Sequence, residues 1–137
     1  MTSPSVELQS AVYERLTTEA IVVGLVAGRV YDNVPADAVF PYISFGPSDY
    51  YTDDSDCIPS RIETLQIDCW AMDHGKLRPA RELADAVKRA LHEYEVEFSE
   101  SGLVEMRVTR VVVMADPGDR IAHGIVTLQA IIEESEW

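Results

Sequence analysis

Three stretches of the chain carry apolar residues three or four positions apart, the spacing of a buried helix face. The first predicts a helix over residues 4–17, begun by the capping residue Ser3. The second predicts a short helix over residues 21–27, which Gly28 ends. The third predicts the most clearly marked helix of the chain, over residues 78–93. The expected buried positions are Leu8, Ala11, Val12 and Leu16, then Ile21, Val22, Leu25 and Val26, then Leu83, Ala84, Val87 and Leu91.

Three longer segments instead follow the two-residue period of strands. Residues 61–72 alternate between apolar and polar side chains, which predicts a strand with one face in a core. Residues 103–114 and 121–132 are strand-like runs on either side of a short turn, so they should form an antiparallel hairpin. The expected core positions are Leu65, Ile67, Cys69 and Ala71 in the first strand and Val126, Leu128, Ala130 and Ile132 in the last.

Two shorter strands complete the pattern. Pro35 and Pro41 bracket a polar turn, and each disfavours helix in the residue before it. The aromatic segment that follows predicts a strand over residues 42–45, which Gly46 ends. A further short strand is expected over residues 95–98.

The order of these elements predicts an α+β fold. Strands that follow one another through turns give a mainly antiparallel sheet, and two main helices should pack on one face of it. The length of 137 residues fits one domain, so we expect residues 1–137 to fold as a single unit.

Charge narrows the classes of partner. The chain has 11 basic and 24 acidic residues, a formal net charge of −13 and a pI near 4.4. Such a protein does not hold nucleic acid by neutralising phosphates. Two isolated cysteines, Cys57 and Cys69, favour a reducing cytoplasmic compartment. We expect no signal peptide and no membrane span, since the N-terminus lacks an apolar stretch and no apolar run approaches 18 residues.

The sequence carries no motif for catalysis, a cofactor or a metal. His74, His92 and His123 are scattered, and none stands beside an obvious nucleophile. The acidic residues Asp53, Asp54 and Asp56 resemble the start of a calcium loop, but the glycine and glutamate at the required offsets are missing. We therefore expect no enzyme, no cofactor and no metal site, and a solvated acidic loop at this position.

Six residues are candidates for a contact with another subunit or protein. Tyr50 and Tyr51 precede the clustered acids, and the whole segment reads as an exposed loop that becomes ordered against a partner. Trp70 falls on the more polar face of its strand. It would either cover a subunit contact or pack under a helix, and the pattern leaves both open. The candidate contact residues are Tyr50, Tyr51, Asp53, Asp54, Asp56 and Trp70.

The chain resembles the tail completion or tail terminator family of long-tailed phages and phage-like gene transfer agents. The matching landmarks, which run over nearly the whole chain, are L-Q-S-A-V-Y-E-R-L from Leu8, G-R-V-Y-D-N-V-P from Gly28, F-P-Y-I-S-F-G from Phe40, C-W at Cys69 with the helix after Pro79, and H-G-I-V-T-L-Q-A from His123.

This resemblance implies a structural role in the virion. Similar proteins form a hexameric ring at the head-proximal end of the tail tube. The ring ends tube polymerisation and joins the tail to the neck or connector, with DNA passing through its lumen without specific binding. The implied partners are copies of the chain itself, a tube protein and a neck protein, assembled in the host cytoplasm. Two alternatives stay open: another ring subunit of the particle, such as a head-tail connector, or a small ligand-binding domain or enzyme.

Overall fold

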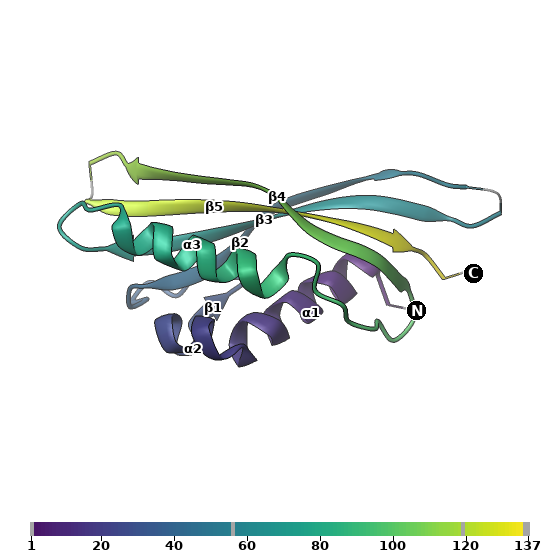
Figure 1. Ribbon diagram of the computed structural model, residues 1–137, viewed down its shortest axis with the longest axis horizontal. Helices are drawn as coiled ribbons and strands as arrows, with labels where there is room; N and C mark the ends of the chain where they lie inside the picture. Colours follow the sequence, from purple (N-terminus) through teal and green to yellow (C-terminus); the bar gives the residue numbers. More distant parts are fainter. Residues whose placement is uncertain (1, 56, 119, 136–137) are drawn as a thin grey trace.

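The computed structural model describes residues 2–55, 57–118 and 120–135, and it shows the predicted α+β architecture. Helices α1 (Pro4–Thr18), α2 (Ala20–Val26) and α3 (Arg78–Leu91) lie on one face of a five-stranded sheet (Figure 1). The strands are β1 (Val30–Tyr31), β2 (Tyr42–Thr52), β3 (Ser60–Met72), β4 (Gly102–Asp116) and β5 (Ile121–Glu133).

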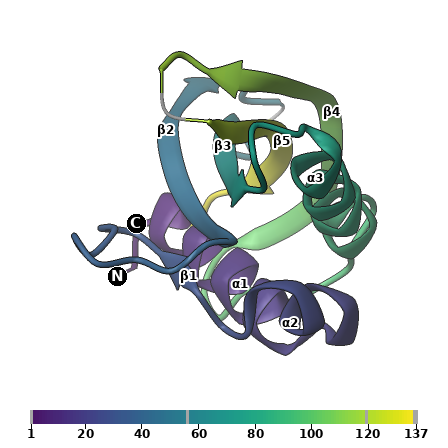
Figure 2. The same ribbon diagram turned by 90° about the vertical axis from the view of Figure 1, so that its left-hand side faces the viewer.

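The sheet has the strand order β1-β2-β3-β5-β4. Only the short β1 pairs in parallel, with β2, and every other neighbouring pair is antiparallel. Strands β4 and β5 form the expected hairpin. The view turned by 90° shows how strongly the sheet twists between its two ends (Figure 2).

The core lies between the sheet and the helices. Strand β5 alternates strictly, so that every second side chain from Ala122 to Ile132 is buried against the helices. Gly124 lies in this row, where a Cβ would stand 3.3 Å from the Cβ atoms of Ala84 and Cys69. The missing side chain lets α3 approach the sheet closely. The predicted core positions of β3, β5 and α3 are all buried.

The helices begin and end within two residues of the predicted bounds, but one residue predicted to be buried is exposed. The Ser3 side chain accepts a hydrogen bond from the N–H of Ser5, as a capping residue should. In α2, Val22 and Val26 are buried, but Ile21 is 56% exposed and was wrongly placed in the core. A helix of two turns buries one narrow stripe four residues apart, and Ile21 falls outside that stripe.

Two strand predictions were wrong. Strand β2 does not end at Gly46, because a bulge between Phe45 and Ser48 absorbs the irregular residues and pairing with β3 then resumes as far as Thr52. Residues 95–98 form no strand and instead run as an unpaired connection between α3 and β4.

Candidate functional site

The extension of β2 builds a protruding arm, defined here as residues 49–60. This ribbon reaches past the start of α1 at one end of the long axis (Figure 1). The backbone N–H of Asp53 donates to the carbonyl of Ser60 over 2.9 Å, and Ser55 pairs with Ile58 near the tip. The Asp54 carboxylate accepts a hydrogen bond of 3.0 Å from the Ser60 N–H. Hydrogen bonds to Ser60 therefore hold the predicted acids Asp53 and Asp54 within a hairpin.

Tyr50 and Tyr51 belong to β2, so the prediction of a loop at these two residues was wrong. Tyr51 stands opposite Ile62 and Tyr50 opposite Glu63, which puts the two rings on opposite faces of the ribbon. The exposed fraction is 56% for Tyr51 and 53% for Tyr50. Asp53 and Asp54 are also exposed, whereas Asp56 lies outside the described residues.

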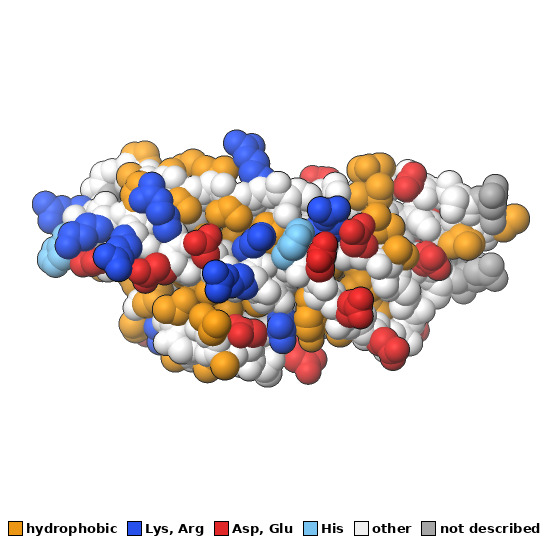
Figure 3. Space-filling view, in the orientation of Figure 1, with side chains coloured by type: hydrophobic (Ala, Val, Ile, Leu, Met, Phe, Trp, Pro, Cys, Tyr) orange, Lys and Arg blue, Asp and Glu red, His pale blue; other side chains and the backbone are white. Residues whose placement is uncertain are grey.

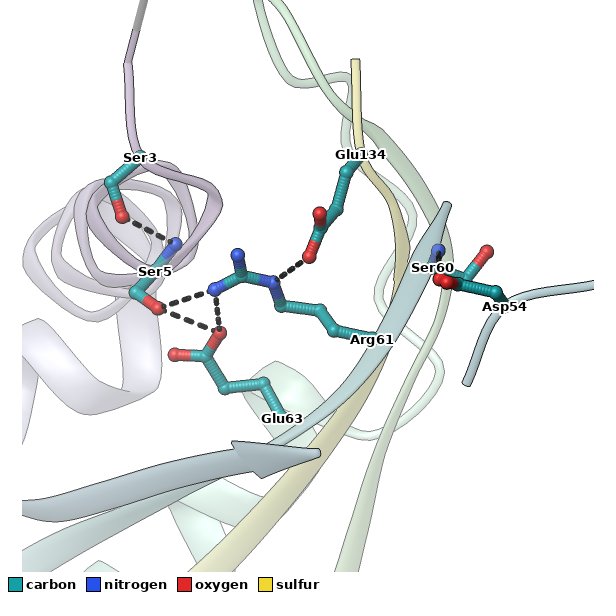
Figure 4. A network of polar contacts seen from close by, with 7 residues as sticks. All are labelled: Ser3, Ser5, Asp54, Ser60, Arg61, Glu63 and Glu134. Atoms are coloured by element: carbon teal, nitrogen blue, oxygen red, sulfur yellow. Dashed lines mark hydrogen bonds and ion pairs between the residues drawn. The ribbon is translucent and has the colours of Figure 1, made fainter. Parts of the chain in front are cut away.

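A buried arginine fastens the base of the arm. The Arg61 Nε donates to the Glu134 carboxylate over 2.6 Å, and its Nη1 lies 3.1 Å from the Ser5 hydroxyl and 3.5 Å from Glu63 (Figure 4). The guanidinium also lies 3.7 Å from the centroid of the Tyr50 ring. Arg61 thereby joins β2, β3, α1 and the segment after β5. It was not singled out from the sequence, where one arginine at the start of a strand carries no signal.

Trp70 lies on the sheet face opposite the helices, so the alternative of packing under a helix is wrong. Its ring stacks on His123, with 3.8 Å between centroids and an interplanar angle of 9°, and its Nε1 donates to the Ser44 hydroxyl over 2.9 Å. His123 Nε2 in turn lies 2.7 Å from the Asp68 carboxylate. These contacts hold the Trp70 ring in a fixed orientation on the sheet face opposite the helices.

The structure does not bring Trp70 together with the arm. Trp70 lies eight residues along β3 from Ile62, a separation of roughly 26 Å at 3.3 Å per residue. The candidate contact residues therefore divide between two surfaces. Asp68, Ser44 and His123 were missed as neighbours of Trp70 because their proximity depends on strand register, which the sequence pattern alone does not fix.

Strand β4 forms one edge of the sheet, and part of that edge is covered. The N–H of Glu93 donates to the carbonyl of Met106, and the N–H of Val108 donates to Nδ1 of His92 over 3.1 Å. His92 ends α3 and presents its ring to β4, so in this arrangement it acts as a hydrogen-bond acceptor.

Charge is divided between the two ends of the long axis. Basic side chains gather over the end where α3 begins, and acidic ones are more frequent toward the arm (Figure 3). More than half of the 11 basic residues lie in or beside α3: Lys76, Arg78, Arg81, Lys88, Arg89 and Arg120. All six are exposed. The arm carries the exposed acids Asp49, Asp53 and Asp54.

The described residues form an acidic surface hollow but no cluster of metal-ligating side chains. No group of three or more histidine, cysteine or acidic side chains among them is arranged to hold a metal ion. A surface hollow of about 700 Å³ lies between the connection after α3 and β4, and its acidic lining consists of Glu93, Glu95, Glu97 and Glu105. In the described part of the chain, no helix combines the length and apolar character needed to cross a membrane.

Comparisons with known proteins match this architecture. A solved chain described as "Virion of native gene transfer agent (GTA) particle" superposes with a TM-score of 0.87 at 24% identity, covering 97% of this chain and 99% of the other. That likeness establishes a shared fold. The search of curated proteins found no match. The model of the family described as "Tail completion protein gp17" matches residues 10–133, and the chain therefore belongs to this family of structural virion components.

Proposed function

We propose that this protein is a tail terminator, which forms a ring, most simply a hexamer, at the head-proximal end of a tail tube. The ring ends polymerisation of the tube and joins the tail to the neck. The observation that carries this proposal is the family match over residues 10–133. The fold shared with a chain of a gene transfer agent virion is consistent with it.

The surfaces of the chain fit an architectural role. The arm presents exposed tyrosines and acids, and the sheet face opposite the helices carries the half-buried Trp70 ring; hydrogen bonds hold each in place. Such surfaces suit contacts with a tube protein on one side and a neck protein on the other. In this role the protein carries out no reaction, and its partners are recognised by shape and charge.

The net charge of −13 supports passage of DNA through the ring. An anionic wall offers phosphates no cationic partners, so DNA would slide without being held. Screening limits this field to about 8 Å at physiological salt, so that only residues lining the lumen contribute.

Particles made without this protein provide the test. If it is a terminator, negative-stain images will show tails of uncontrolled length or tails detached from heads. Tails of normal length that remain attached to heads would overturn the proposal. Normal tails beside unfilled heads would point instead to a connector. A reconstruction of the neck in intact particles would then count the copies in the ring.

A further inference from the structure

We propose that the arm of one copy docks against the basic end of the next copy around the ring. The basic end is defined here by Lys76, Arg78, Arg81 and Arg120. This inference rests on the proposed ring and names the two surfaces that close it. In this contact, a second copy of this chain covers the acidic surface of the arm.

Complementary charge at opposite ends of the molecule carries the inference. Asp49, Asp53 and Asp54 are exposed on the arm, and the one basic residue nearby, Arg61, is buried and already bound to Glu134 and Glu63. The arm therefore presents an uncompensated negative surface. Opposite charges across an interface steer association and set its register.

The basic end is equally well defined. It is built where the β3–α3 connection and the β4–β5 turn meet, and Arg120 lies close to Gly75 there. Arg78 pairs with Glu82 over 3.0 Å, but both side chains are largely exposed and such a pair contributes little. Asp73, Glu82 and Asp116 lie in the same region, so among the described residues the four basic side chains exceed the acidic ones by one, in a chain that is otherwise strongly acidic.

The placement of the two surfaces favours a head-to-tail contact. The arm and the start of α3 lie at opposite ends of the longest axis (Figure 1). A contact between different surfaces of identical chains repeats from copy to copy, and it closes into a ring when the rotation between copies allows. The acid-to-base contact would also reduce the repulsion between copies that each carry −13.

Zero-length crosslinking in intact particles tests the contact directly. A carbodiimide joins a lysine amine to a carboxylate with loss of water, and this chain has only two lysines, Lys76 and Lys88. We expect mass spectrometry to find Lys76 joined to Asp49, Asp53 or Asp54. These residues lie at opposite ends of one copy, so the product must join two copies. The internal control is the pair Asp85 and Lys88, three residues apart on α3.

The absence of the Lys76 product, while the Asp85–Lys88 product forms, would overturn the inference. So would a product that joins the arm's acids to a lysine of a different particle protein. Either result would leave the proposed terminator function standing, because that is decided by tail length and attachment in particles without the protein.

Charge reversal provides an independent test. Asp49→Lys with Asp53→Lys should lower incorporation into particles about tenfold or more, since like charges would then meet at the contact. Glu95→Lys with Glu97→Lys makes the same change of charge on an exposed segment outside both surfaces and should incorporate normally. Co-expression of the arm variant with a Lys76→Glu, Arg81→Glu chain should restore mixed rings. Equal loss in the matched control, or no loss in the arm variant, would contradict the contact.

Discussion

The guanidinium carbon of Arg61 lies 3.7 Å from the centroid of the Tyr50 ring, while its Nε and Nη1 pair with Glu134 and Glu63 respectively. Arg61 and Glu63 are 6% and 2% exposed, so removing the arginine leaves a buried carboxylate without its cationic partner and with only the Ser5 hydroxyl bound to it. We expect Arg61→Ala to lower the free energy of unfolding by about 3–5 kcal/mol. Urea denaturation measures this.

The matched control is Arg107→Ala, which removes an exposed arginine 3.7 Å from Glu105. That change should cost less than about 1 kcal/mol, because solvent screens exposed pairs. Replacing Glu63 by Gln in the Arg61→Ala chain should recover part of the loss. Equal losses in the free energy of unfolding for Arg61→Ala and Arg107→Ala would contradict a stabilising role for the buried network around Arg61.

The carboxylate of Glu7 is held by the loop before β4. Burial raises its pKa, but hydrogen bonds from the backbone N–H groups of Glu100 and Ser101 and from the Ser99 hydroxyl outweigh burial and hold the pKa below its ordinary value of 4.5. A depressed folded-state pKa stabilises the protein fully above pH 4.5, and this stabilisation is lost as pH falls through the folded-state value.

Glu7→Gln should therefore lower stability at pH 7 by about 1–3 kcal/mol and flatten the fall in stability below pH 4.5. Thermal unfolding between pH 3 and 7 measures both effects. Glu97→Gln, at an exposed position on the neighbouring segment, is the control and should retain the wild-type profile. A Glu7→Gln profile parallel to that of the wild type would contradict this role for the carboxylate.

Two glycines should respond in opposite directions to the same substitution. Gly24 lies within α2 and a Cβ there meets nothing within 4 Å, so Gly24→Ala should stabilise the protein by about 0.5–1 kcal/mol. Gly124→Ala brings its methyl within 3.3 Å of the Cβ atoms of Ala84 on α3 and Cys69 on β3, and we expect a loss of about 1–3 kcal/mol. The melting temperatures of the two variants measure both effects. A higher melting temperature for Gly124→Ala would contradict the close approach of α3 to β5 at this residue.

The two thiols should differ sharply in reactivity. Cys69 is fully buried, and that burial raises the pKa of its thiol far above the ordinary value, so the nucleophilic thiolate is scarce. Cys57 is exposed on the arm. A colorimetric thiol titration should count one reactive group in the native protein and two in denaturant. Rapid labelling of Cys69 in the native state would contradict the buried position.

The sequence predicted the parts of the fold that local patterns control. Alternation in β3 and β5 identified the buried faces because each strand has one face against the helices. The cap at Ser3 and the apolar spacing of α3 are also patterns within a few neighbouring residues, and both predictions are confirmed. The extension of β2 was missed because Gly46 and Pro47 are typical of a strand end, and pairing with β3 overrides that preference through a bulge.

The candidate site was harder to predict. Tyr50 and Tyr51 were found as exposed aromatics, yet the fastening by Arg61 depends on α1 and on the segment after β5, which meet only in the folded chain. The stacking of Trp70 on His123 likewise depends on the register between β3 and β5. Contacts of this kind join residues far apart in sequence and leave no periodic pattern.

The arm has one further consequence. Strand β5 ends opposite Ser60, so the ribbon beyond this point has only two strands and no core beneath it. Isolated two-stranded ribbons are marginally stable in water. Amides near the tip should therefore exchange hydrogen far faster than those of β5, and cleavage by proteases should begin there. Whatever surface receives the tip must also offset the entropy lost when the ribbon becomes fixed.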